Sequence, residues 1–237
     1  MRRVLSAALV LITLVAASAN ADKNARKVDL FWSAPDLASF GVRSIAVLPF
    51  ATFDGNLEAR RTCEAVLGQQ FKGTGYRWVS APLAKELLQR DGGDSLVKAY
   101  NEKMLKTARL DSLDAPRFAR ATRTRALLSV RIEQFEKREL EFNQSGHAAT
   151  TVQMRAALVD STGRLLWTAS GSETMEGPYQ EVATGSLGVK ASGLNTTPVQ
   201  EGGAPSYTEV LAKLLGRWAE QFPRPAAAAA PADSTRK

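Results

Sequence analysis

The sequence predicts an α/β (α+β) domain built on a single mixed β-sheet of about five strands, in the order β-α-β-α-α-β-β-β-α. Short apolar runs alternate with helical segments through residues 42–125, and this alternation indicates parallel strand pairing. Residues 126–171 have the pattern of three consecutive strands, and residues 207–222 that of an amphipathic helix. We therefore expect helices to pack on one sheet.

The first half of the domain is expected to alternate strand and helix. Residues 42–50 (VRSIAVLPF) are apolar at successive positions, which is typical of a strand buried on both faces, and Pro49 ends it because proline has no N–H to donate. A helix over residues 57–72, a strand over 76–80 and a helix with Pro82 in its first turn should follow. Residues 91–113 and 114–122 are expected to be helical too.

Residues 126–171 predict the antiparallel part of the sheet. In the first of its strands the apolar parity changes at Phe135, which indicates a bulge near Gln134. The second strand ends at Asp160, and Asp160 with Gly163 predicts a tight turn, since Asp bonds its own backbone and Gly accepts positive φ. In the last strand we expect one face to carry Leu165, Trp167 and Ala169.

The chain divides into five expected segments. Residues 1–21 are predicted to be a cleaved secretory signal, because Arg2 and Arg3 precede an apolar run and Ala19-Asn20-Ala21 suits signal peptidase; the alternative is an uncleaved anchor. Residues 22–41 form a lead-in that should pack on the domain, with an exposed binding arm as the alternative, and residues 42–222 form the domain itself. Residues 177–206 form a long loop inside it, and the low-complexity tail 223–237 is expected to be disordered.

The predicted export determines the expected compartment and limits the classes of partner. A secreted chain works in the periplasm or outside the cell, so we expect no nucleic acid partner despite the net charge of +7. We expect an envelope protein instead, with the membrane surface or the cell wall as alternatives.

The candidate binding residues are basic or lie in the long loop. Arg117, Arg120 and Arg123 recur every third residue, so we expect them to share a helical face, which is either solvated or meets an acidic partner, lipid head groups or cell-wall phosphate. The charged stretch 135–142 is expected to be a sheet edge that is either protected from aggregation or used for binding. The other candidates are Lys137 and Arg138 in that stretch and Tyr179 and Lys190 in the loop.

The motifs that would indicate an enzyme lack the other residues that catalysis requires. Ser95 lies in a Gly-Asp-Ser-Leu tetrapeptide that one esterase family uses, but no Asp lies three residues before His147, the single histidine. We expect His147 to be an exposed loop residue and Cys63 a buried thiol, with a reactive or intermolecular thiol as the alternative, since one Cys and one His cannot form a zinc site or an intrachain disulfide. The sequence therefore predicts no cofactor, no metal and no catalysis.

Four stretches resemble a group of bacterial envelope proteins: VRSIAVLPF, YRWVSAPLAKELL, RTRALLSVRIEQF and LVDSTGRLLW. They are similar to the small α/β domain of the curli secretion lipoprotein and of the penicillin-binding-protein activator lipoproteins, and in layout to the TolB N-terminal domain. The resemblance covers about residues 42–171 and the last helix. It implies an envelope role without catalysis, and it implies that Asp160, Gly163 and Trp167 serve the fold. The chain departs from the lipoproteins in having no Cys to carry a lipid at the predicted cleavage point.

These observations favour a non-catalytic exported protein that binds another envelope component in assembly or transport. Its expected contact regions are the charged edge and the loop 177–206. A small-ligand or polysaccharide binding module that uses the same loop is the alternative, and a hydrolase based on Ser95 ranks last.

Overall fold

The computed structural model describes residues 29–53, 55–141, 144–180 and 203–225. Within them the strands are β1 (Leu30–Ser33), β2 (Ser44–Val47), β3 (Ala51–Thr52), β4 (Arg77–Val79), β5 (Ala126–Arg138), β6 (Gly146–Asp160) and β7 (Leu165–Gln180). The helices are α1 (Leu57–Gln70), α2 (Ala81–Thr107), α3 (Ala115–Thr122) and α4 (Tyr207–Gln221), with short 3₁₀ turns at Leu37–Phe40 and Lys72–Thr74. The predicted signal peptide and most of the predicted tail lie outside the described residues.

One mixed sheet joins all seven described strands, in the order β1-β7-β6-β5-β2-β4, with β3 paired to β5. The pairs β2–β4, β2–β5 and β3–β5 are parallel, whereas β5, β6, β7 and β1 are antiparallel. The predicted α/β class and single mixed sheet are thus confirmed. The additional strands are β1, which lies in the predicted lead-in, and β3, which has two residues.

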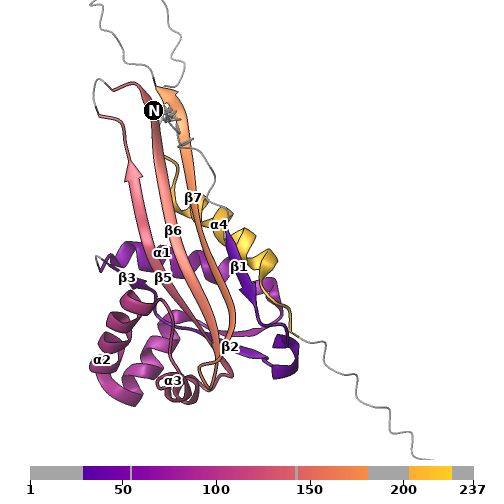
Figure 1. The fold of residues 1–237 in the computed structure, drawn as a ribbon. Coiled ribbons are helices and arrows are strands. Elements are labelled where there is room, and N and C mark those ends of the chain that lie inside the picture. Colours follow the sequence, from indigo (N-terminus) through magenta and orange to yellow (C-terminus); the bar gives the residue numbers. More distant parts are fainter. Residues whose placement is uncertain (1–28, 54, 142–143, 181–202, 226–237) are drawn as a thin grey trace, which may run out of the picture.

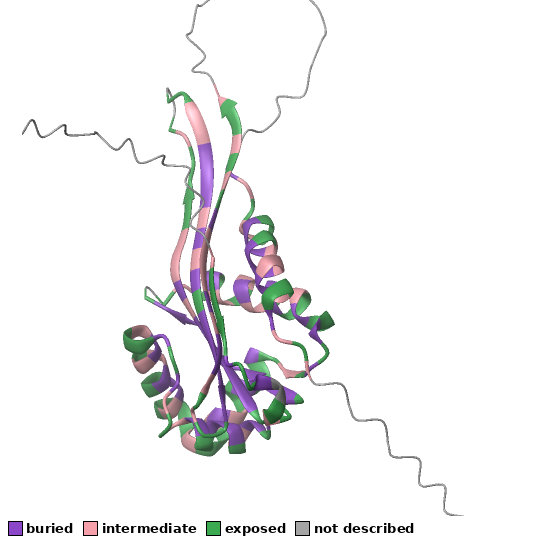
Figure 2. Ribbon diagram, turned by 45° about the vertical axis from the view of Figure 1, so that its right-hand side comes forward, coloured by how far each residue is buried: buried purple, intermediate pink, exposed green. Residues whose placement is uncertain are grey.

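The helices cover the sheet on both faces (Figure 1). The apolar sides of α1 and α4 pack on one face in a core around Trp167, Trp218 and Phe71. α2 and α3 pack on the other face in a smaller core around Tyr100 and Phe118. Figure 2 shows the buried residues concentrated where the helices flank the sheet, whereas the far ends of β5 and β7 are largely exposed.

The expected bulge lies where the parity of β5 changes. Ile132 pairs with Met154 and Gln134 with Gln153, so Glu133 is the extra residue. A second irregularity separates Leu158 from Val159 and corrects one expectation. Leu165 packs with the smaller core, whereas Leu166, Trp167 and Ala169 face the larger one, because Leu166 is an extra residue opposite that irregularity.

One helical expectation holds and one needs correction. The segments predicted as separate helices before and after residue 91 are the two parts of α2, which a non-helical residue, Gly93 with φ of 71°, divides at a kink. α2 ends at Thr107 rather than at residue 113, with Ala108 in the left-handed region. Gly93 supports the kink because a residue without a Cβ adopts this conformation at little cost.

Candidate functional site

Three long strands extend beyond the helices as an arm (Figure 1). We define the arm as residues 133–138 of β5, 146–153 of β6 and 172–180 of β7. On the side away from β6, the parallel partners of β5 end at Leu128, which pairs with β2, and at Ile132, which pairs with β3. Among the described strands nothing pairs with that side of residues 133–138, so this part of β5 is a free edge.

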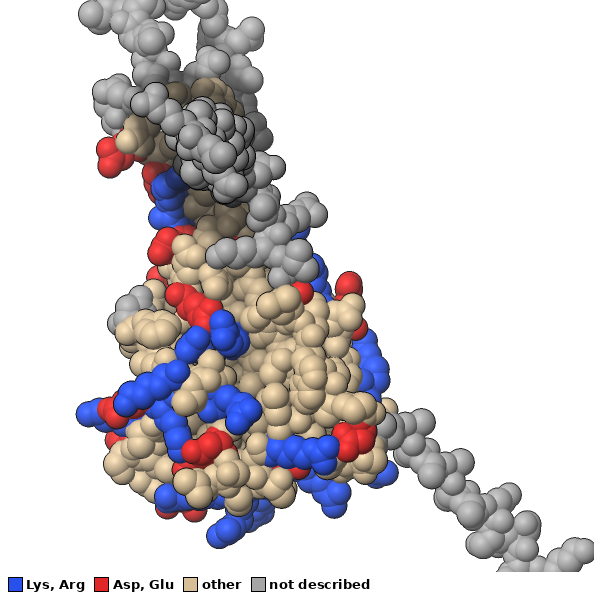
Figure 3. Space-filling view, viewed as in Figure 1, with Lys and Arg blue, Asp and Glu red and all other residues tan. Residues whose placement is uncertain are grey.

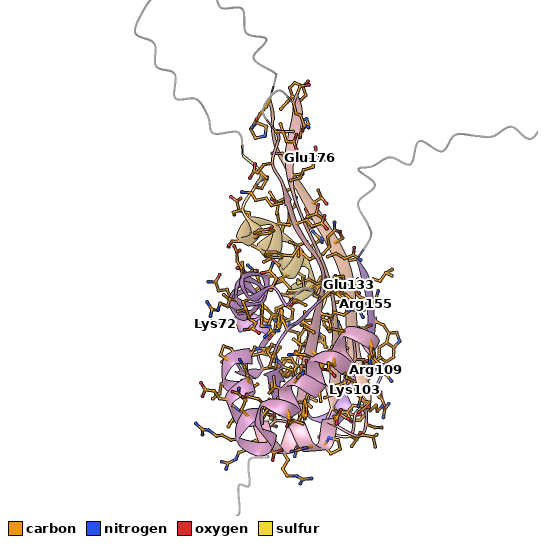
Figure 4. All side chains as sticks on the ribbon, turned by 90° about the vertical axis from the view of Figure 1, so that its left-hand side faces the viewer. Lys72, Lys103, Arg109, Glu133, Arg155 and Glu176 are labelled. Atoms are coloured by element: carbon orange, nitrogen blue, oxygen red, sulfur yellow. The ribbon has the colours of Figure 1, made fainter. Side chains whose placement is uncertain are left out.

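An ion cluster lies at the root of the arm, on the face opposite α1 and α4. The carboxylate of Glu133 forms ion pairs with Arg131 and with Arg155, the latter at 3.3 Å, and accepts a hydrogen bond of 2.9 Å from Gln153. Arg131 also donates to the carbonyl of Leu105 at the end of α2. Burial acts to raise the pKa of Glu133, but the two guanidinium groups outweigh it and hold this pKa below its ordinary value. Figure 4 shows Glu133 and Arg155 side by side, with Glu176 farther along the arm.

Near its tip the arm brings together Arg138 and Tyr179, two of the predicted residues, with His147. The guanidinium of Arg138 donates to the His147 carbonyl at 3.4 Å. The ring of Tyr179 meets the His147 imidazole edge-on, at 5.3 Å between ring centres, and Tyr179 is 57% exposed. Lys137 is also exposed and forms an ion pair of 2.8 Å with Glu139. The arm therefore presents two cations and an aromatic ring to solvent.

His147 does not lie in a loop, which corrects the prediction. It is the second residue of β6 and is half-buried. Its Nδ1 lies 2.8 Å from the carbonyl oxygen of Gly177. Because a carbonyl oxygen can only accept, Nδ1 carries the proton of this hydrogen bond and holds the ring against β7.

The end of the predicted loop lies against the arm. The hydroxyl of Thr150 donates to the carbonyl of Pro205 at 2.5 Å, and the backbone N–H of Ala204 donates to Glu139 at 3.0 Å. Ser206 and Glu209 then start α4 with reciprocal side-chain to backbone hydrogen bonds. Residues 177–180, predicted as loop, belong to β7, while Lys190 and the rest of 181–202 lie outside the described residues.

The predicted arginine run lies at the opposite end of the molecule, which we call the base. α3 precedes β5, so it lies at the end of β5 away from the arm tip (Figure 1). Arg117 pairs with Asp91 at 2.6 Å, and Arg120 is exposed on the same helix. Arg123 follows the last helical residue with φ of 52°, so the expectation of one shared helical face is wrong. Figure 3 shows many Lys and Arg side chains around this helical end, mixed with acidic ones.

Asp160, Gly163 and Trp167 occupy the β6–β7 turn and the core beside it. One carboxylate oxygen of Asp160 accepts from the backbone N–H groups of Thr162 and Arg164 at 2.7 and 3.0 Å. Gly163 has φ of 87°, and a Cβ there would overlap the backbone of Ser112. Trp167 is fully buried in the larger core. All three are placed to stabilise the fold.

The described residues bring no catalytic group together around Ser95. Its hydroxyl donates to the carbonyl of Gly92 within α2, and His147 lies on the arm rather than beside it. Cys63 is fully buried, and burial raises the pKa of its thiol. In this part of the chain no three His, Cys, Asp or Glu residues are grouped in a way that could hold a metal ion. None of the helices there is long and apolar enough to cross a membrane.

One apolar part of the predicted lead-in is exposed, which was the alternative to a packed segment. β1 pairs with β7 through its backbone, yet Leu30 and Trp32 are 67% and 46% exposed, and Phe31 is also exposed. The run LFWS indicates a strand, because aromatic and apolar residues are typical of strands. The large size of its side chains favoured the prediction that the segment packs on the domain.

Comparison with known proteins finds solved structures that are similar to this chain. No family model matches the chain, and no curated protein matches it. Similar solved structures include the lipoprotein GNA1162 from Neisseria meningitidis, with 17% identity, a TM-score of 0.47, and coverage of 76% of this chain and 96% of that one. A PelC dodecamer from Paraburkholderia phytofirmans has 18% identity and a TM-score of 0.39, and covers 80% of this chain and 94% of that one. The C-terminal domain of LpoB from Salmonella enterica has 21% identity and a TM-score of 0.31, and covers 56% and 82%. A bacterial lipoprotein is thus among the solved structures that this chain resembles.

Proposed function

We propose that this chain is a non-catalytic exported protein of the bacterial envelope that binds another envelope component in assembly or transport. The observation that carries the proposal is the free edge of β5 on an arm that extends beyond the helices. A free edge presents unpaired backbone N–H and C=O groups, and an extended segment of another protein can pair with them.

The side chains of this edge suit reversible contact. Glu136, Lys137 and Arg138 are exposed, so the edge stays hydrated until a partner displaces the water. Charges of both signs also steer a partner into one register, because like charges placed opposite each other are unfavourable. The same charges would protect the edge from aggregation, and the experiment below separates these roles.

β1 offers a second contact region. Its outer side has no strand partner among the described residues, and the exposed Leu30, Phe31 and Trp32 adjoin it. Large apolar side chains grouped on a surface favour a protein partner over plain solvent exposure. The alternative of a small-ligand or polysaccharide module depended on the loop 177–206, most of which lies outside the described residues.

Site-specific photo-crosslinking in the cell tests the proposal. A benzoyl-phenylalanine placed at Lys137, Tyr179 or Trp32 should crosslink to one discrete envelope protein. The same group at Arg120, an exposed residue of the base, is the matched control and should not. Equal crosslinking at all four positions, or none at any of them in exported and folded protein, would reject a specific contact at the arm or at β1.

The proposal excludes catalysis, and this exclusion has its own test. Purified protein should hydrolyse p-nitrophenyl esters no faster than its Ser95→Ala/His147→Ala double variant. A hydrolysis rate that the double variant abolishes would replace the binding proposal with a hydrolase.

A further inference from the structure

A groove opens beside α1 at the β4 edge of the sheet. Its volume is about 420 Å³. The floor is formed by apolar side chains from four elements that lie far apart in the sequence, namely Val47, Leu67, Phe71, Trp78, Ala81 and Pro82. Ligand pockets in proteins are about 300–1,000 Å³ and mostly apolar with a few polar groups, so this groove has the size and lining of a small-ligand site.

The groove is open because α1 carries small residues where it extends over the end of the sheet. Ala65 and Gly68 form its wall on the α1 side, and no atom lies within 4 Å of the position that a Cβ of Gly68 would occupy. β4 is the last strand on this side, and the chain after it enters α2, which packs mainly on the other face. Within the apolar lining Trp78 is half-buried and Pro82 is exposed, whereas the other four side chains are buried behind them.

The charge of Arg61 at the mouth favours an anion. Arg61 is exposed on the groove wall and has no ion pair within the described part of the chain. Glu64, the acidic residue of the lining, accepts a hydrogen bond of 3.2 Å from the backbone N–H of Phe50. Burial raises the pKa of Glu64, which disfavours its charged form. Of the two charged residues that line the groove, Arg61 is therefore the one whose charge is free to meet a ligand.

From the apolar lining and the unpaired Arg61 we propose that the groove binds a single-chain anionic amphiphile, with its acyl chain along Trp78 and its carboxylate at Arg61. The volume lies near the lower end of the range for ligand sites, which favours one acyl chain over the two of a phospholipid. The chain replaces water on the floor, and the guanidinium donates hydrogen bonds to the carboxylate. This site is separate from the arm and does not depend on the proposed partner contact.

Calorimetric titration of the full-length exported chain with oleate, below the concentration at which oleate forms micelles, tests the site. Wild-type protein should bind one oleate per chain with saturation. Gly68→Leu fills the groove, and because leucine favours a helix more than glycine does, the variant should fold at least as well as wild type. It should weaken binding at least about tenfold, which corresponds to about 1.4 kcal/mol.

Two further variants separate the contribution of the ligand's carboxylate from that of its acyl chain. Arg61→Ala should weaken oleate binding about threefold, as expected for a partly hydrated charge pair. Arg109→Ala, which removes an exposed arginine near the end of α2 outside the groove, should leave the affinity unchanged. Oleyl alcohol, which has the same chain without the charge, should bind wild type and Arg61→Ala equally.

Three results would overturn the proposal. One is the absence of saturable binding to wild-type protein. Another is an unchanged affinity in Gly68→Leu, which would place any bound oleate elsewhere. The third is binding only to anionic phospholipid vesicles, insensitive to Gly68→Leu, which would indicate a membrane surface contact instead of a groove ligand.

Discussion

Arg217 on α4 connects the segment before β1 to the arm, and its replacement tests how the first strand is attached. The guanidinium pairs with Asp29 at 2.7 Å and with Glu173 at 2.6 Å, and the side chains of these acids are 7% and 9% exposed. Asp29 lies over Gly171, where a Cβ would clash with its carboxylate. Arg217→Met removes the charge and keeps much of the apolar stem.

The expected loss of stability depends on the ion pairs that Asp29 and Glu173 keep in Arg217→Met. Glu173 keeps Lys213 at 2.9 Å, whereas no other ion pair of Asp29 occurs within the described residues. Removing one partner of a fully buried ion pair costs about 3–5 kcal/mol. Arg217 is 36% exposed, so water screens the pair, and we expect a lower loss of about 2 kcal/mol in the free energy of unfolding.

Urea unfolding and amide hydrogen exchange measure this change. The backbone N–H of Ala34 donates to the carbonyl of Leu166 and reports on the attachment of β1. Its exchange should be faster in Arg217→Met, because β1 loses its ionic attachment. The control Lys213→Met removes a half-exposed charge one helical turn away and should cost less than about 1 kcal/mol. A loss below about 0.5 kcal/mol in Arg217→Met, with unchanged exchange at Ala34, would refute the reasoning.

Three further predictions concern the turn and the same ion network. Asp160→Ala should lower the free energy of unfolding by about 2 kcal/mol, since two backbone donors lose a charged acceptor, while Asp160→Asn should cost less; urea unfolding compares them. Gly163→Ala should cost at least about 2 kcal/mol, because it adds positive-φ strain to an overlap with Ser112, and thermal unfolding that matches wild type would contradict this. Burial alone would raise the pKa of Glu173, but Lys213 and Arg217 hold it below the ordinary value of 4.5, so its stabilisation is complete above that pH and lost as pH falls through the lower folded value. The stability difference between wild type and Glu173→Gln should therefore shrink between about pH 7 and pH 3, and a constant difference would exclude the linkage.

The class of the fold follows from periodicity, and the departures from prediction have local physical causes. The parity change at Phe135 located the bulge because a period of two loses phase when one residue is added. β1 and β3 have four and two residues, which is too short for a period to be recognised. The sequence predicts an earlier end for β7 than the structure has, because Gly177 and Pro178 are typical of loops. In the structure these two residues lie opposite Ala148, where the register with β6 shifts, and a bulge tolerates a residue without an N–H.

The candidate sites were less predictable than the fold. Lys137 and Arg138 could be placed on an edge because a run of alternating charges does not suit a buried strand. The contacts that Arg138 and Tyr179 both make with His147 depend on the register of β6 with β5 and with β7, which the sequence does not specify across the residues that separate them. The groove could not be predicted, since its wall and floor unite residues from β2, α1, β4 and the start of α2.

The parallel half of the sheet contributes mainly to stability, and the antiparallel half carries the proposed partner contact. The short parallel strands are covered on both faces, so replacements there disturb a core. The antiparallel strands continue past the bulge at Glu133, and Phe135 and Val152 beyond the bulge still pack in the larger core. Beyond it Lys137 and Arg138 are exposed, and removing either charge should change the free energy of unfolding by less than about 0.5 kcal/mol. Variants of Lys137 and Arg138 can therefore be tested for partner binding with the fold intact, whereas a loss of binding after changes at Asp160 or Trp167 would report on folding.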